Sequence, residues 1–149
     1  MELDPSTFET MTPQEFATTV KQLSDREITE IMRGEHRTAI LDAIFDRFPG
    51  QYLPERAKGM AGTFQFRITG GPEDHPHDTY EVRIDGDECT VVPPGSEYDT
   101  SLMMAPPEFL KIATGRGKPT MLVMRGKIKV KGDLTKAAAF PTLFDIPKA

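Results

Sequence analysis

His75, His77 and Asp78 form the only cluster of metal-ligand residue types that the sequence offers. Two imidazoles that flank a proline could hold one metal ion only if further ligands came from elsewhere in the chain. Their segment, residues 70–78, is rich in Gly, Pro and Asp, which is typical of a solvated connection between two strands. We therefore predict no metal site and no cofactor.

The carboxylates of Asp85, Asp87 and Glu88 resemble a general acid/base set. However, they surround Gly86 in a pattern typical of a turn, where acidic residues serve turn formation and solubility. Cys89 follows on an apolar strand with no basic neighbour to lower its pKa, so we expect a buried thiol rather than a nucleophile.

Residues 115–120 (GRGKPT) suggest a phosphate-binding loop, but the spacing is wrong. Ile112 stands where a Walker motif needs its first glycine, and Pro119 replaces the required Ser or Thr after the lysine. A helix end followed by a turn is the better interpretation. An enzyme that uses carboxylates or His77 at a pocket mouth is the weakest of the alternatives.

Apolar, polarizable side chains are more prominent than reactive ones. The chain has eight methionines, and four of them (Met103, Met104, Met121 and Met124) fall within 22 residues. Methionine fills irregular space and adapts to guests of varied shape. The pattern is open to two interpretations, a filled core or the lining of an adaptable pocket.

The basic residues are concentrated near the C-terminus. The net charge is -5 overall, but it is -5 for residues 1–35, -6 for residues 36–105 and +6 for residues 106–149. Lys127, Lys129 and Lys131 alternate with apolar residues on a predicted strand. They form either a solvated sheet face or a patch that contacts anionic lipid headgroups. The acidic balance of the rest of the chain argues against nucleic-acid binding.

The length of 149 residues, 38% of them hydrophobic, predicts one compact domain rather than a disordered chain. A single cysteine excludes an internal disulfide, and the acidic first ten residues have no apolar stretch of the kind that a secretory signal needs. We expect a cytoplasmic protein.

The N-terminal third has the apolar spacing of helices. Thr12–Glu15 and Ser24–Glu27 are two capping boxes, each followed by an apolar stripe. The strongest helix is predicted over residues 37–48, with Pro49-Gly50 as its end. A short helical turn is plausible near residues 53–58.

The period then changes to two, which predicts strands near residues 63–69, 80–85, 88–92 and 100–105. We expect these four strands to form an antiparallel meander. A helix over residues 106–114, a strand over 127–131 and a helix over 133–140 complete an α+β fold.

Four segments in the second half resemble the sterol carrier protein 2 family, the sterol-binding or lipid-transfer domain. They are residues 88–92 (ECTVV), 99–102 (DTSL), 107–115 (PEFLKIATG) and 126–134 (GKIKVKGDL), followed ten residues later by Phe144. The resemblance implies a five-stranded, mostly antiparallel sheet that is covered by helices and encloses an apolar tunnel. It places a lipid-binding domain at residues 36–149 and leaves residues 1–35 as an N-terminal helical extension.

The resemblance also implies a non-enzymatic role, the binding and transfer of a sterol, fatty acid or fatty acyl-CoA. The alternative is an accessory protein that presents a lipid intermediate to a partner enzyme, with residues 1–35 as its docking surface. Self-association as a homodimer through the N-terminal helices is a further expectation. The predicted tunnel lining comprises Phe64, Phe66, Ile68, Val82, Ile84, Leu102, Met104, Phe109, Leu110, Met121, Met124, Ile128 and Leu134.

Overall fold

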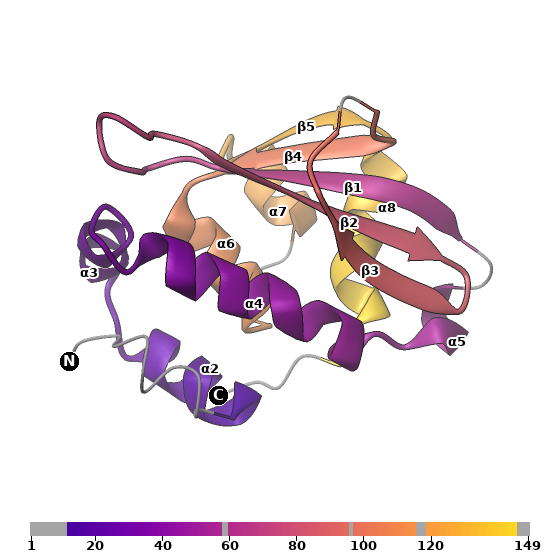
Figure 1. The fold of residues 1–149 in the computed structure, drawn as a ribbon, viewed down its shortest axis with the longest axis horizontal. Coiled ribbons are helices and arrows are strands. Elements are labelled where there is room, and N and C mark those ends of the chain that lie inside the picture. Colours follow the sequence, from indigo (N-terminus) through magenta and orange to yellow (C-terminus); the bar gives the residue numbers. More distant parts are fainter. Residues whose placement is uncertain (1–11, 58–59, 96, 116–118, 146–149) are drawn as a thin grey trace.

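The computed structural model of the chain describes residues 12–57, 60–95, 97–115 and 119–145 (Figure 1). A five-stranded sheet forms one layer, and the helices lie on one of its two faces. Among the described residues, no helix is long and apolar enough to cross a bilayer.

Two short helices begin the described chain, α2 (Pro13–Lys21) and α3 (Asp25–Ile31). Both predicted capping boxes are confirmed, because the hydroxyls of Thr12 and Ser24 accept hydrogen bonds from the backbone N–H of Glu15 and Glu27. In turn, the carboxylates of Glu15 and Glu27 accept hydrogen bonds from the backbone N–H of Thr12 and Ser24. Each box satisfies two N–H groups that a helix start leaves unpaired.

Helix α4 (Arg37–Gln51) is longer than predicted and continues through Pro49. Its end is held by residues far along the chain. The backbone N–H of Leu53 donates to the carbonyl of Leu143 at 2.7 Å, and that of Asp145 donates to Gln51 at 2.8 Å. The prediction that Pro49-Gly50 ends the helix was wrong, since local sequence does not reveal these tertiary bonds. Helix α5 (Pro54–Ala57) follows.

The sheet has the strand order β3-β2-β1-β4-β5. Its strands are β1 (Ala61–Ile68), β2 (Asp78–Asp85), β3 (Glu88–Val92), β4 (Thr100–Met104) and β5 (Ile128–Gly132). The expected mostly antiparallel, five-stranded α+β fold is confirmed, since only the β1–β4 pair is parallel.

The expected meander of four strands is wrong at its last step. Strand β4 does not pair with β3 but lies parallel to β1, with Phe66 opposite Leu102. The connection between β3 and β4 contains Pro93-Pro94, which lack the N–H groups that a tight hairpin would use. It crosses the outer face of the sheet, and Asp99 ends it with a backbone bond to Thr63 (2.9 Å).

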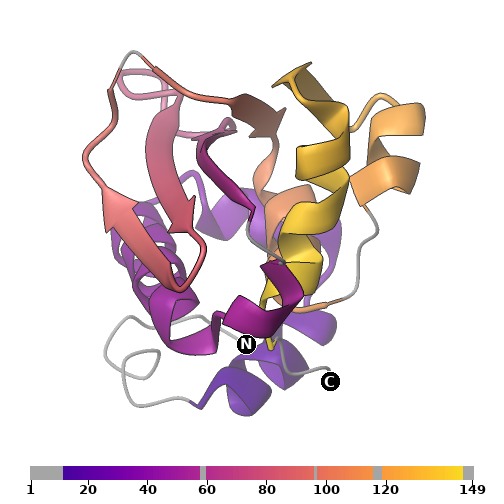
Figure 2. The ribbon, with the colours of Figure 1, turned by 90° about the vertical axis from the view of Figure 1, so that its right-hand side faces the viewer.

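Three helices and a 3₁₀ turn complete the fold. They are α6 (Pro106–Ala113), α7 (Pro119–Met124), α8 (Leu134–Ala139) and η1 (Phe140–Leu143). Figure 2 shows α7 and α8 side by side at one end of the molecule. Helix α7 was not predicted, since six residues carry too little periodicity to identify a helix.

One hydrophobic core joins all these elements. It includes Phe16 and Val20 of α2 and Ile28 of α3, together with residues of α4, the sheet and the later helices. The N-terminal helices therefore share their apolar faces with the rest of the fold. The boundary between residues 35 and 36 stays a prediction.

Candidate functional site

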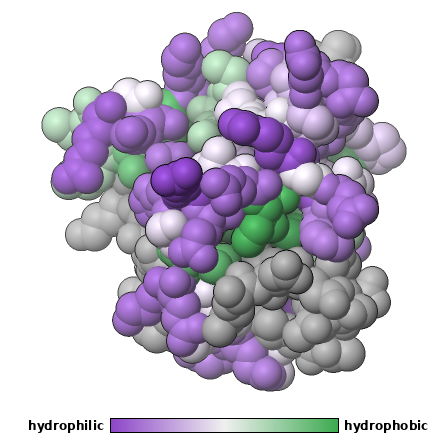
Figure 3. Space-filling view, turned by 90° about the vertical axis from the view of Figure 1, so that its left-hand side faces the viewer, coloured by the Kyte–Doolittle hydropathy of each residue, from purple (hydrophilic) through white to green (hydrophobic). Residues whose placement is uncertain are grey.

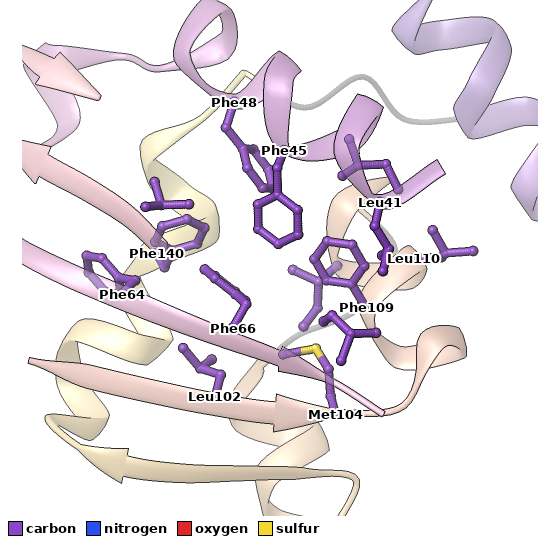
Figure 4. Close-up of a cluster of buried hydrophobic side chains, with 14 of the residues drawn as sticks. Leu41, Phe45, Phe48, Phe64, Phe66, Leu102, Met104, Phe109, Leu110 and Phe140 are labelled. Carbon is purple, nitrogen blue, oxygen red and sulfur yellow. The ribbon is translucent and has the colours of Figure 1, made fainter. Parts of the chain in front are cut away.

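The layer between the sheet and the helices is built largely from aromatic rings (Figure 4). Phe45 and Phe48 come from α4, Phe64 and Phe66 from β1, and Phe140 from η1. All five side chains are buried. Helix α4 contributes two of them because positions three apart lie on one helix face.

Ring contacts across this layer involve five elements, α4, β1, β2, α6 and η1. The Phe140 ring centroid lies 4.7 Å from that of Phe64 and 5.0 Å from that of Phe66. The Phe45 ring stacks on Tyr80 at 4.1 Å and on Phe109 of α6 at 5.2 Å. We call this set of rings the aromatic layer.

Ten of the thirteen predicted lining residues point into the same buried core. Strand alternation places every second residue of β1, β2, β4 and β5 on the inner face of the sheet. The ten are Phe64, Phe66, Ile68, Val82, Ile84, Leu102, Met104, Phe109, Leu110 and Ile128. The structure brings them together, and their contact with a lipid stays a prediction.

The other three predicted lining residues lie at the surface. Met121 is 45% exposed, Met124 is 84% exposed and Leu134 is 51% exposed, so their placement in the interior was wrong. Helix α7 instead packs Leu122 and Val123 against the core. In the first turns of α8, the buried position is Ala137 rather than Leu134. Neither short helix is long enough for its inward face to be read from sequence.

Several residues of the aromatic layer are absent from the predicted lining. Phe45 and Phe48 were predicted only as part of the helix over residues 37–48, and Phe140 only as the end of the helix over residues 133–140. The Phe140 ring also contacts Phe144 at 4.9 Å, and that of Phe48 contacts Phe144 at 5.1 Å. The apolar character of these phenylalanines is visible in the sequence. Which face of η1 points inward is determined only by the tertiary structure.

A polar cluster closes the layer where β1 ends and β2 begins. The buried guanidinium of Arg37 donates to Asp78 Oδ2 at 2.5 Å, to the carbonyl of Ile68 at 2.6 Å and to that of Met32 at 3.0 Å. His75 Nε2 lies 2.8 Å from the other oxygen of Asp78. Burial alone would raise the pKa of Asp78, but its bonds to Arg37 and His75 outweigh burial and lower it.

The other chemically suggestive residues have structural positions. Asp85, Asp87 and Glu88 are exposed in the β2–β3 turn. Cys89 is buried, as expected, and burial raises the pKa of its thiol to about 12. His77 is exposed in the β1–β2 connection. Within the described ranges, no three His, Cys, Asp or Glu side chains lie close enough together to hold a metal ion.

The outer face of the sheet carries a row of hydrogen-bonded polar side chains. Gln65 Nε2 donates to Glu81 Oε2 at 3.2 Å, and Ser101 Oγ donates to Gln65 Oε1 at 2.9 Å. The backbone N–H of Gly95 donates to the same oxygen of Glu81. Viewed from the α3 end, the molecular surface is also mostly hydrophilic, with one apolar patch near its centre (Figure 3). The apolar interior is thus confined to the inner face of the sheet.

The profile of the SCP-2 sterol transfer family matches residues 41–145, from within α4 to the residue after Phe144. The chain belongs to this family. The domain that defines this family indicates lipid binding or transfer, and the aromatic layer lies wholly inside the matched range. The resemblance stated from the sequence is therefore confirmed.

A curated relative of this SCP-2 family member is hydroxysteroid dehydrogenase-like protein 2 of Xenopus laevis. It is 31% identical over 80 residues, which cover 54% of this chain and 19% of that protein. The chain spans about a fifth of the length of the curated relatives that it matches first.

Solved structures show the same SCP-2 fold. Palmitated SCP2L2 from Aedes aegypti has a TM-score of 0.54 at 18% identity, over 74% of this chain and 95% of that one. The sec-alkylsulfatase Pisa1 from Pseudomonas sp. has a TM-score of 0.60 at 18% identity, over 95% of this chain and 25% of that one.

Proposed function

We propose that the chain is a non-enzymatic lipid carrier, which binds the hydrocarbon of a lipid in an apolar tunnel between the sheet and helices α4, α6 and α8. The observation that carries the proposal is the aromatic layer. It consists of buried apolar side chains from β1, α4, α6 and η1, and it lies within the range that defines the family.

Hydrocarbon burial supplies enough free energy for such binding without a polar anchor. Each buried methylene contributes about 0.8 kcal/mol, so twelve methylenes contribute roughly 10 kcal/mol before costs. The translational and rotational freedom lost on association, together with the ordering of lipid and side chains, costs about 4–15 kcal/mol of this gain. At the lowest of these costs, about 6 kcal/mol remains, which corresponds to a Kd of tens of micromolar, and longer chains bind more tightly. A site that depends on apolar contact tolerates several lipid classes.

A long-chain fatty acid is the first guest to test. The SCP2-like protein from Aedes aegypti that shares this fold was determined in a palmitated state. Sterols and fatty acyl-CoA are the other members of the proposed class. Delivery of the guest requires contact with a membrane, which we assign to the side of the molecule that carries Lys127, Lys129 and Lys131.

A non-enzymatic role is supported by the state of the residues that could react. The raised pKa keeps the Cys89 thiol protonated at neutral pH, so it is a poor nucleophile. The Asp78 carboxylate is engaged by Arg37 and His75 at the edge of the layer. The carboxylates of Asp85, Asp87 and Glu88 are exposed where β2 ends and β3 begins.

The adjacent residues Met103 and Met104 provide a matched test of the tunnel. Met104 is buried on the inner face of β4, whereas Met103 is half-buried on the outer face. We expect Met104→Phe to weaken displacement of a fluorescent fatty acid several-fold and Met103→Phe to leave it unchanged. Far-UV circular dichroism and thermal melting check that both variants fold.

Native mass spectrometry of gently purified protein, followed by lipid extraction, identifies the guest. We expect an adduct that extracts as a fatty acid or sterol. A protein that carries no adduct and does not displace the fluorescent fatty acid would contradict the carrier proposal. Binding without transfer between vesicles would instead favour presentation of a lipid to a partner enzyme.

A further inference from the structure

The edge of the sheet changes where β3 ends. Strand β3 contacts α4 and lies beside β2 only at residues 81–85 of β2. The first residues of β2, Asp78–Tyr80, pair with β1 on one side. After Val92 the chain turns onto the outer face of the sheet, where the N–H of Gly95 donates to Glu81 at 2.9 Å. Within the described ranges, β2 is therefore the edge of the sheet at Asp78–Tyr80.

Tyr80 fills this part of the edge with its side chain. It lies opposite Phe66 in the strand register, and its ring stacks on Phe45 of α4 at 4.1 Å, with 8° between the ring planes. Its hydroxyl donates to Asp42 Oδ1 at 2.5 Å. Tyr80 is half-buried and Asp42 is exposed, whereas Phe45 and Phe66 are buried. Tyr80 is thus a member of the aromatic layer that reaches solvent.

The polar contact of Tyr80 is a single bond between two side chains. Burial raises the pKa of Tyr80 far above its usual value, and the bond to Asp42 raises it further, so the hydroxyl stays protonated and donates at neutral pH. Because Asp42 is exposed, water can replace the phenol as its partner. The bond therefore holds the ring in place, yet breaking it leaves no buried charge.

Two neighbouring parts of the layer are held by more bonds. The side chain of Arg37, which is 3% exposed, donates to three acceptors at the start of α4. At the far end of α4, two backbone hydrogen bonds connect residues 51–53 to residues 143–145. An opening at either place would break several bonds or leave a buried charge without its partner. Rotation of the Tyr80 side chain breaks one bond and moves no backbone.

We propose that Tyr80 and Asp42 form a gate through which the hydrocarbon of the lipid enters and leaves the aromatic layer. When the ring turns outward about its Cα–Cβ bond, Phe45 loses a stacking partner at the edge of the sheet. The hydrocarbon of the guest then takes the place of the ring against Phe45 and continues to Phe66. The inference rests on the proposed carrier function, for which it supplies the path of the guest.

A gate differs from a lining residue in what its substitution changes. A lining residue contacts the bound guest, so its loss mainly speeds release and weakens affinity. A gate is closed in both the empty and the loaded protein, so a weaker gate speeds entry and release by the same factor. The dissociation constant then stays unchanged.

Stopped-flow exchange of cis-parinaric acid, a fluorescent fatty acid, tests the gate on the full chain. Tyr80→Phe keeps the ring and removes the hydroxyl, so it should speed association and release each by about fivefold, the effect of one lost hydrogen bond. Its equilibrium affinity should equal that of the wild type. Tyr52→Phe is the matched control, because the Tyr52 hydroxyl donates to the carbonyl of Gly86 beyond the far end of α4.

Asp42 is tested in the same assay. Asp42→Ala should speed both rates like Tyr80→Phe, and the double variant should be no faster than either one, because both substitutions remove the same bond. Asp46→Ala is the control. It removes an exposed carboxylate about one turn further along α4 and so measures the effect of charge on the anionic probe.

Exchange rates that are equal in the wild type, Tyr80→Phe and Asp42→Ala would overturn the gate, provided that circular dichroism shows all three to be folded. So would a weaker affinity at an unchanged association rate, because Tyr80 would then belong to the lining. Faster exchange in Tyr52→Phe alone would place the path at the other end of α4. In each of these cases the protein still binds lipid, and only the gate is contradicted. A wild type that binds no lipid contradicts the carrier function, and the gate with it.

Discussion

At the scale of single residues, Arg37 is the side chain that organises one end of the fold. Its guanidinium connects Met32 after α3, Ile68 at the end of β1 and Asp78 at the start of β2. The Arg37 side chain is 3% exposed and that of Asp78 is 13% exposed. A buried charge of this kind is costly without its partner, so the pair is a point where one substitution has a large effect.

Asp78→Asn should lower the free energy of unfolding by about 3 kcal/mol, because it leaves Arg37 buried without a counter-charge. The pKa of Asp78 is lowered in the folded state, so its stabilising effect is complete above the unfolded pKa of about 4 and is lost as pH falls through the folded value. Urea unfolding of wild type and variant from pH 7 to pH 3 measures both effects. A difference that does not shrink toward acid pH would contradict the assigned role.

Cys89 provides a second test at this scale. Because burial raises the pKa of its thiol to about 12, reaction with iodoacetamide at pH 8 should be far slower in the folded protein than in urea. Mass spectrometry follows the alkylated fraction with time. Equal rates in the two states would show that the β2–β3 edge opens freely.

At the scale of elements, the ten residues of α8 and η1 pass from the surface of the molecule into its core. The start of α8 presents Leu134 to solvent, whereas η1 places Phe140 and Leu143 in the core. Two backbone hydrogen bonds, from Leu53 to Leu143 and from Asp145 to Gln51, connect η1 and the residues after it to the end of α4. These elements thus form one wall of the aromatic layer.

Phe140→Ala should lower the free energy of unfolding by about 3–5 kcal/mol, because the lost ring leaves a cavity against Phe64 and Phe66. A saturating fatty acid should then raise the melting temperature of the variant more than that of the wild type, since its chain fills the cavity. Leu134→Ala on the exposed side of α8 is the control, with an expected change within about 0.5 kcal/mol. Calorimetry with and without lipid would contradict the assignment if both variants behaved alike.

At the scale of the whole molecule, the chain separates an apolar interior from a polar outer sheet face and gathers positive charge at its C-terminal end. The negative charge lies mainly in the first 105 residues. The apolar layer on the inner face of the sheet is where the proposed lipid guest would lie.

Guest binding should be linked to global stability, because a ligand that binds only the folded state raises the free energy of unfolding. We expect the affinity for saturated fatty acids to rise by about fourfold for each added methylene until the chain fills the layer. Thermal shift and displacement assays across a series of chain lengths measure this dependence. An affinity that is independent of chain length would place the lipid outside the apolar interior.

The sequence by itself determined the element types, the family and most of the apolar inner face. The capping boxes at Thr12 and Ser24 are local patterns, and so is the alternation of Phe64, Phe66 and Ile68. Both can therefore be predicted without knowing which distant residues these side chains contact. The same alternation explains why the eight predicted lining residues on strands are buried together, whereas Phe109 and Leu110 lie on α6.

Only the tertiary structure decided how these elements are joined and which short helices face inward. The parallel pairing of β4 with β1 and the extension of α4 past Pro49 depend on bonds to residues about 35 to 95 positions away in the chain. Met121, Met124 and Leu134 are as apolar as the buried residues, yet they lie outside, because a helix of six residues can turn either side to the core. Hydrophobicity alone does not specify that choice. The packing of α7 and α8 against β5 determines which side of each helix faces the core, and it leaves these three side chains on the surface.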